Sequence, residues 1–181
     1  KALNEEGVDY EIFQLGAGAM RDCIGCLRCS DKGCVFDDDA VNEFLAKARE
    51  ADGFVFGSPV YYAHPSGRIL SFLDRAFYAG SRNSAGSPFA GKPGAAVVSA
   101  RRGGTTASLD VLNKYFTIAS MPVVGSSYWN MVHGSKPEDV LEDKEGIQTM
   151  RNLGHNMAWM LQHLHEGFPS QEKGARTNFI R

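Results

Sequence analysis

The four cysteines of the sequence lie within one stretch of twelve residues, and the rest of the chain contains none. They follow the pattern CxxCxxCx4C, formed by Cys23, Cys26, Cys29 and Cys34. Three thiolates at this spacing can converge from one turning loop, and the fourth can approach from the far side of that loop. The pattern favours a four-cysteine iron–sulfur cluster over zinc, because zinc sites prefer paired CxxC motifs. Free or redox-active thiols, zinc and a disulfide remain alternatives.

Composition and charge limit the classes of function. The 181 residues are 43% hydrophobic and 22% charged, which is typical of a globular domain with its own core. The net charge of −2, without a stripe of Lys and Arg, gives no indication of a nucleic-acid partner. No apolar run approaches the roughly 20 residues of a membrane span, so no membrane partner is expected. Cysteines confined to one cluster indicate metal or redox chemistry in a reducing cytoplasm.

Residues 53–75 are the second stretch that could carry chemistry. The apolar run at 54–56 is typical of a strand buried on both faces, and we expect it to end at the Gly-Ser-Pro of 57–59. An aromatic loop follows, and apolar residues then recur at helical spacing from Ile69. Ligands of parallel sheets bind beyond the carboxyl ends of such strands. The stretch therefore predicts one wall of a site for a planar cofactor, although tyrosines that merely cover a loop are an alternative.

A second loop of the same kind runs from 99 to 104, where Arg-Arg-Gly-Gly follows another buried strand. Both loops should project to one rim of the sheet. Glycines let the backbone approach a ligand closely, and loop N–H groups can donate to carbonyls or ring nitrogens. Tyrosine offers a flat face for stacking, and an Arg can stabilise an anionic ring or a phosphate.

The other elements complete an alternating α/β pattern, which predicts a parallel sheet between helices in one domain, 1–181. We expect a cysteine-rich loop at 16–36, a flexible surface segment at 81–91 and a polar tail at 167–181. The predicted strands are 8–13, 93–99 and 122–128, and the predicted helices are 41–49, 105–120 and 143–166.

Together these motifs resemble the flavodoxin-like NAD(P)H-dependent FMN reductases, and among them the iron–sulfur flavoproteins. The resemblance covers the chain from Gly7 to about Leu164. It is carried by the cysteine run with its three following aspartates, the Ser-Pro-Val-Tyr of 58–61, the Phe-Leu-Asp-Arg of 72–75 and the Gly103-Gly104 loop.

The resemblance implies a flavodoxin-like three-layer sandwich that binds FMN. The residues that it assigns to the cofactor come from the two loops: Ser58, Pro59, Val60, Tyr61 and Tyr62 along the isoalloxazine, and Ser99, Ala100, Arg101, Arg102, Gly103 and Gly104 at its polar edge. In the family the phosphate is held by a loop after the first strand, and this sequence has no counterpart of that strand or loop. We expect roughly 25–30 further N-terminal residues, the length of one strand, loop and partial helix.

The function that the resemblance implies is an FMN-binding oxidoreductase. Electrons would pass from NAD(P)H through the flavin to a quinone, another small acceptor or a 4Fe–4S cluster held by the four cysteines. Hydride transfer to the ring needs no side-chain acid or base, so no catalytic residue is predicted. The alternative is an electron carrier between protein partners such as ferredoxin, and a third reading is a structural zinc protein. Flavin sites of the family lie at subunit contacts, which implies a homodimer or homotetramer.

Overall fold

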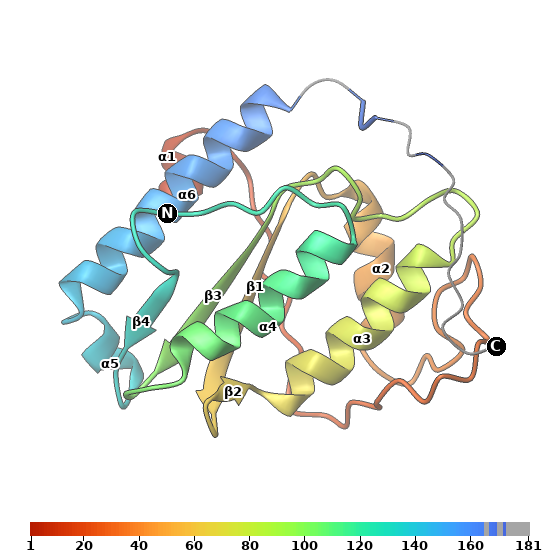
Figure 1. The fold of residues 1–181 in the computed structure, drawn as a ribbon, viewed down its shortest axis with the longest axis horizontal. Coiled ribbons are helices and arrows are strands. Elements are labelled where there is room, and N and C mark those ends of the chain that lie inside the picture. The colour runs from red at the N-terminus through yellow and green to blue at the C-terminus, as the bar shows by residue number, and fades with distance from the viewer. Residues whose placement is uncertain (165–166, 170–171, 173–181) are drawn as a thin grey trace.

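The computed structural model describes residues 1–164, 167–169 and 172, which form a sheet between two layers of helices (Figure 1). The sheet has the order β2-β1-β3-β4. Its parallel strands are β1 (Phe54–Tyr61), β3 (Gly94–Ala100) and β4 (Met131–His133), and β2 (His64–Pro65) pairs antiparallel with the end of β1. This sandwich around a mostly parallel sheet confirms the predicted fold class.

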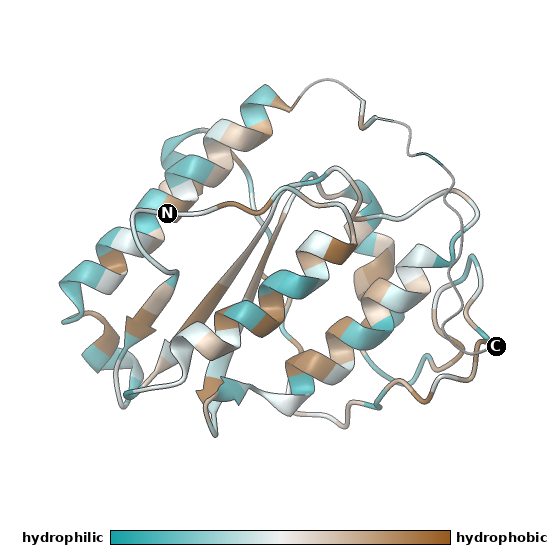
Figure 2. Cartoon of the chain, viewed as in Figure 1, coloured by the Kyte–Doolittle hydropathy of each residue, from teal (hydrophilic) through white to brown (hydrophobic). Residues whose placement is uncertain are grey.

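One face of the sheet packs against a largely aromatic core. The helices on this face are α2 (Val41–Glu50), α3 (Gly67–Ser81) and α4 (Thr105–Ile118). Phe56 of β1 stacks on Phe116 of α4 with ring centroids 5.7 Å apart, and Phe44 of α2 meets Phe72 of α3 at 4.9 Å. Figure 2 shows hydrophobic residues along β1 and β3, and hydrophobic residues that alternate with hydrophilic ones along α3 and α4, as expected for helices with one buried side.

The opposite face of the sheet is covered unevenly. Its helices are α6 (Lys144–His163) and the short α1 (Ala2–Glu5), with α5 (Pro137–Val140) beside β4 (Figure 1). On β3, Ala95 is fully buried against Leu153 and Met157 of α6. On β1, Val55 is 46% exposed, and Gly57 and Pro59 are exposed too. Within the described chain, the face of β1 that points away from α3 and α4 is therefore open.

The predicted end of the first buried strand is wrong, because β1 continues through the Gly-Ser-Pro sequence to Tyr61. Phe54 N donates to Pro93 O at 2.9 Å, toward β3, and backbone groups alternate in direction along a strand. The nitrogen of Pro59 consequently points to the edge that β3 does not occupy. Its missing N–H costs no hydrogen bond of the parallel ladder, so a proline is tolerated at this position.

The predicted strand at 122–128 is also wrong. Within that range only Val123 forms a bridge to β3, and the chain then leaves the sheet before it returns as β4. A contact to α6 holds this excursion, since Ser126 Oγ donates to Thr149 O at 2.6 Å. Side-chain hydrogen bonds of this kind compete with the ladder of a sheet.

The predicted strand at 8–13 is likewise wrong, because the described part of the sheet contains no ladder to it. Side chains hold the segment in place instead. Glu11 pairs with Lys47 of α2 at 2.7 Å, and Phe13 packs against Phe44 and Phe72. An alternating pattern produces a strand only where a neighbouring strand supplies hydrogen-bond partners.

The predicted helices at 41–49 and 105–120 are confirmed to within two residues at each end, as α2 and α4. The predicted helix at 143–166 is confirmed as α6, which begins one residue later and ends at His163, three residues early, with Leu164 as its C-cap. The expected last helix reached 166, and residues 165–166 lie outside the described residues, as does most of the predicted tail at 167–181. In the described part of the chain, no helix is both long enough and apolar enough to cross a membrane.

The segment at 81–91, expected to be a surface excursion, carries a residue of the core. Phe89 is fully buried and stacks on Phe77 of α3 with ring centroids 4.2 Å apart. The Ser- and Gly-rich composition of the segment gives no sign of this contact, because a single aromatic residue makes it.

We expect Phe89→Ala to lower the free energy of unfolding by about 3–5 kcal/mol, because it removes a stacked ring and leaves a cavity. The control is Ile118→Ala, since Ile118 is 86% exposed and its loss should change stability by no more than about 0.5 kcal/mol. Denaturant titration of both variants measures the difference. Similar effects of the two substitutions would show that residues 81–91 do not belong to the core.

Candidate functional site

A groove opens on the uncovered side of the sheet, near the carboxyl ends of β1 and β3. Pro59 and Ser99 are partners in the parallel register, and both line the groove. The volume of the groove is about 290 Å³, at the lower end of the range for ligand pockets. Its other lining residues are Gly57, Ser58, Val97, Val98, Val132 and Met150. Ligands of open parallel sheets bind at this end of the strands, so the groove lies where the sequence predicts a ligand.

Three of the predicted cofactor residues meet here, namely Ser58, Pro59 and Ser99. The hydroxyl of Ser58 is engaged within the protein: it donates to Pro59 O at 2.8 Å and accepts from Ser66 N at 3.0 Å. Ser66 is in turn the N-cap of α3 and accepts from Ile69 N. The side chain of Ser58 thus ties the end of β1 to the start of α3.

The other predicted residues lie in the loops after β1 and β3 or within the sheet. Tyr61 and Tyr62 are exposed at the turn between β1 and β2, where Tyr62 has a φ of 51°. Arg101 and Arg102 are exposed after β3, and Ala100 is buried within the sheet. None of these side chains lines the groove. The structure therefore brings the two loops together without placing tyrosine rings or guanidinium groups inside the groove.

Gly104 is the point at which the two loops touch. Its φ is 95°, and a Cβ there would lie 2.4 Å from Ala63 Cα and 2.9 Å from Val60 Cγ1. Glycine is required for both the left-handed backbone and the close approach. At the neighbouring Gly103, by contrast, a Cβ would meet no atom within 4 Å.

The second candidate site is a cavity between the cysteine loop and α3. It is lined by all four cysteines, Cys23, Cys26, Cys29 and Cys34, together with Phe36, Arg75, Tyr78 and nearby loop residues. No cysteine is in a disulfide, and Cys23 is the most exposed of the four. Burial, followed by the charges of the three neighbouring thiols, raises the pKa of the Cys29 thiol. The thiols therefore lie close enough to repel one another when ionised.

This donor set fits a multi-iron cluster better than a single metal ion. Among the described residues, no three His, Cys, Asp or Glu side chains are gathered tightly enough to hold one ion. The four thiols nevertheless line one cavity, whose volume of about 10 Å³ is the space of about one water molecule. The donor set suits a four-cysteine cluster, whose thiolates would bind different iron atoms, but the loop would have to move outward to make room for it.

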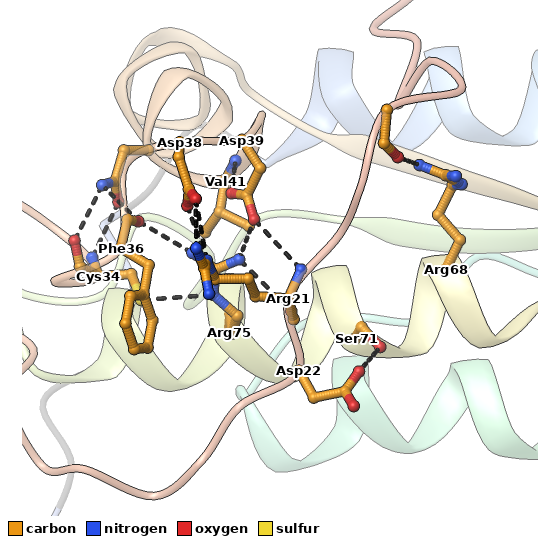
Figure 3. Close-up of polar contacts among 12 residues, drawn as sticks. Arg21, Asp22, Cys34, Phe36, Asp38, Asp39, Val41, Arg68, Ser71 and Arg75 are labelled. Atoms are coloured by element: carbon orange, nitrogen blue, oxygen red, sulfur yellow. Dashed lines mark hydrogen bonds and ion pairs between the residues drawn. The ribbon is translucent and has the colours of Figure 1, made fainter.

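A buried ion pair fixes the last cysteine of the loop against α3 (Figure 3). Arg75 pairs with Asp39, and their side chains are only 1% and 4% exposed. Arg75 also donates from Nε to the sulfur of Cys34 at 3.4 Å and from Nη2 to Phe36 O at 2.9 Å. Burial opposes the charge of Arg75, but the hydrogen bonds to Asp39 and Cys34 hold the pKa of its guanidinium above the ordinary value.

The same face of α3 holds the loop at two further positions (Figure 3). Arg68 Nη2 donates to Ala17 O at 3.2 Å, and Ser71 Oγ donates to the carboxylate of Asp22. Arg68, Ser71 and Arg75 are spaced three and four residues apart, which places them on one side of the helix. The helix thus acts as the support on which the cysteine loop is built.

Asn42 of α2 clamps the backbone around Cys34 from the other side. Its Oδ1 accepts from Cys34 N at 2.8 Å, and its Nδ2 donates to Cys34 O at 2.9 Å and to Phe36 O at 3.2 Å. Asn42 and the contact of Arg75 could not be predicted from the sequence, because no spacing rule links either position to the cysteines. The only sequence feature near these contacts is the run of aspartates after the last cysteine, which predicts the start of a helix. Asp39 does accept from Val41 N at 3.2 Å, at the first residue of α2.

Known proteins share both the sequence and the fold of this chain. The family described as NADPH-dependent FMN reductase matches residues 1–136. An iron–sulfur flavoprotein of Methanocaldococcus jannaschii is 35% identical over 165 residues, which cover 87% of this chain and 83% of that protein. The structure of a flavone reductase aligns with a TM-score of 0.66 at 16% identity, over 93% of this chain and 58% of its own. A flavodoxin from the domain Archaea aligns with a TM-score of 0.54 at 16% identity, over 90% and 84% of the two chains. The structural matches establish the flavodoxin-like fold.

We expect Gly104→Ala to lower the free energy of unfolding by about 1–3 kcal/mol, because the methyl group adds a backbone clash to an unfavourable φ. Gly103→Ala is the matched control and should stay within about 0.5 kcal/mol of the parent, because its methyl group meets open space. Denaturant midpoints of the two variants decide the matter. Equal stability would mean that the two loops are not in close contact.

Proposed function

The chain belongs to the NADPH-dependent FMN reductase family, and we propose that it binds FMN in the groove between β1 and β3 and transfers electrons from NAD(P)H to a quinone or another small acceptor. The observation that carries this proposal is the meeting of Pro59 and Ser99 at an open groove of about 290 Å³. A flat ring needs an uncovered end of the sheet with backbone close by, and the groove offers both.

The groove would hold a ring through backbone groups and small side chains. Gly57 and Pro59 leave little bulk on the sheet surface, and Val132 and Met150 form an apolar wall. In this proposal the exposed Tyr62 and the 101–104 loop close over the ring from the rim.

When bound, FMN supplies the redox chemistry, because it takes a hydride from a nicotinamide and gives up two electrons with protons to an acceptor. The residues of the chain bind the ring, orient it and keep water away from it. We assign no side-chain acid or base.

The cysteine cavity favours a second function, that of an iron–sulfur flavoprotein which carries electrons between protein partners such as ferredoxin. We propose that Cys23, Cys26, Cys29 and Cys34 hold a 4Fe–4S cluster, which exchanges electrons singly. The arrangement of four thiols around one cavity supports this, as does the 35% identity to an iron–sulfur flavoprotein. Ile24 and Leu27, beside the cavity, are both exposed and leave its mouth accessible to a partner.

We propose further that the protein works as a homodimer or homotetramer in the cytoplasm. Tyr62 is fully exposed at the tip of a hairpin, and aromatic side chains are enriched in subunit interfaces. Four thiols outside any disulfide suit a reducing compartment. A light-scattering mass equal to one chain would contradict the oligomer.

Anaerobically purified protein provides the test of the cofactors. We expect flavin absorption bands with a broad cluster shoulder, and about four irons and four sulfides per chain. Cys29→Ser should lose the iron and keep the flavin bands, whereas Ser30→Ala, a neighbour that does not line the cavity, should keep both. Colourless protein without iron would contradict both proposed cofactors.

Turnover separates the two functions. Steady NADPH or NADH oxidation with a quinone supports the reductase, and we expect Cys29→Ser to retain this activity because the flavin groove is intact. Turnover that occurs only with reduced ferredoxin, and that Cys29→Ser abolishes, supports the electron carrier instead. Absence of turnover with either donor would contradict both functions.

A further inference from the structure

We propose that Arg75 sets the reduction potential of the iron–sulfur cluster by donating a hydrogen bond to the sulfur of Cys34. This inference rests on the proposed function, because it requires Cys34 to be an iron ligand. Arg75 is a positioning residue in this role, since it acts through the cysteine and not on a substrate.

The side chain of Arg75 is committed to this corner of the cavity. It is almost fully buried, and its nitrogen atoms contact Asp39, the sulfur of Cys34, Phe36 O and Arg21 O. Its guanidinium carbon also lies 5.8 Å from the centre of the Phe36 ring. These contacts leave the guanidinium one orientation, in which Nε is aimed at the sulfur.

Cys34 is distinguished from the other three cysteines by this contact. Within the described part of the chain, no other side chain donates a hydrogen bond to a cysteine sulfur. The backbone of Cys34 is also held on both sides by Asn42, whereas Cys23 lies exposed on the outer part of the loop. The thiol of Cys34 therefore accepts a hydrogen bond from a cationic side chain, whereas the thiols of Cys23, Cys26 and Cys29 accept none in the described part of the chain.

A buried ion pair alone does not explain the arginine. The pair holds the loop, but replacing a buried pair by apolar residues of similar volume is often neutral or stabilising, so this role does not by itself account for a charged pair at this position. A donor to a ligand sulfur has a different consequence, because reduction adds negative charge to the cluster and its sulfurs. Hydrogen bonds to the sulfurs favour the reduced form and raise the potential. Asp39 opposes this effect, since its negative charge faces the same guanidinium.

The two members of the pair should therefore shift the potential in opposite directions. The double substitution Arg75→Met with Asp39→Asn removes the donor without leaving a buried charge unpaired, because methionine has a similar length and no N–H. The donor contacts the sulfur directly, whereas Asp39 acts through the guanidinium, so the loss of the donor should outweigh the loss of Asp39. We expect the double variant to decrease the equilibrium constant for one-electron reduction about tenfold, which is about 59 mV toward more negative potential. Asp39→Asn alone keeps the donor and removes the opposing charge, so we expect a shift toward more positive potential.

Two further variants separate the hydrogen bond from charge and from folding. Arg75→Lys keeps a cation for Asp39 but has no Nε donor of the same geometry, so its potential should also become more negative. Arg21→Gln is the matched control, because Arg21 pairs with Asp38 at 2.6 Å and lies 5.2 Å from the centre of the same Phe36 ring. Arg21 does not contact a sulfur, so its loss should leave the potential unchanged.

The measurement is a redox titration of the anaerobic protein monitored by electron paramagnetic resonance, with iron and flavin content determined for each variant. Opposite shifts for the double variant and for Asp39→Asn, with Arg21→Gln unchanged, support the inference. Unchanged potentials in all Arg75 variants would overturn the inference and leave the cluster proposal intact. Loss of iron from both the double variant and Arg75→Lys, with the flavin retained, would have the same meaning. Parent protein that takes up no iron overturns the inference and the cluster proposal together.

Discussion

The buried pair of Arg75 and Asp39 is the interaction on which the cysteine site depends. The cysteine loop contains neither a helix nor a strand. Contacts with neighbouring elements must therefore fix its irregular backbone. Arg75 brings a charge from the middle of α3 into the layer between helix and loop, and Asp39 meets it from the segment before α2. Breaking one partner of such a pair strands a buried charge and commonly costs about 3–5 kcal/mol. The last cysteine is therefore placed by the same contact that joins the two helices to the loop.

The second constraint is the uneven cover of the sheet. α6 lies over β3, while Val55, Gly57 and Pro59 of β1 remain exposed. A strand with one open face and small residues near its carboxyl end leaves room for a flat ligand against the backbone. The groove and the cysteine cavity are both organised by α3, whose N-cap Ser66 bonds to Ser58 of β1 and whose outer face holds the loop.

Much of this arrangement could be predicted from the sequence, for reasons that differ between elements. Apolar runs and helical spacing are local signals, so β3, α2, α4 and α6 were found close to their observed limits. The end of β1 was misplaced, because the tolerance for Pro59 depends on which edge its nitrogen faces, and no sequence pattern states that direction. The excursion around Ser126 was read as a strand, because the competing hydrogen bond comes from α6, more than twenty residues away. Phe89 was assigned to the surface for the same reason, since its partner Phe77 lies in another element.

The site was predictable to a similar extent. The spacing of Cys23 to Cys34 indicated a cluster, and the structure places all four side chains around one cavity. The predicted flavin residues separate into two groups. Ser58, Pro59 and Ser99 line the groove, whereas Tyr61, Tyr62 and Arg101 are exposed in the loops after β1 and β3. Asn42 and Arg75 could not be found by spacing, because their contacts exist only once two helices have packed against the loop.

The most direct measurement is a crystal structure of the anaerobically prepared protein, with iron located by its anomalous scattering. We expect iron at several positions within the cavity, bound by the sulfurs of Cys23, Cys26, Cys29 and Cys34, and a flavin ring against Pro59 and Ser99. We also expect Arg75 Nε within hydrogen-bonding distance of the Cys34 sulfur. A single metal ion or a disulfide among these cysteines, together with a groove that contains no flavin, would contradict it.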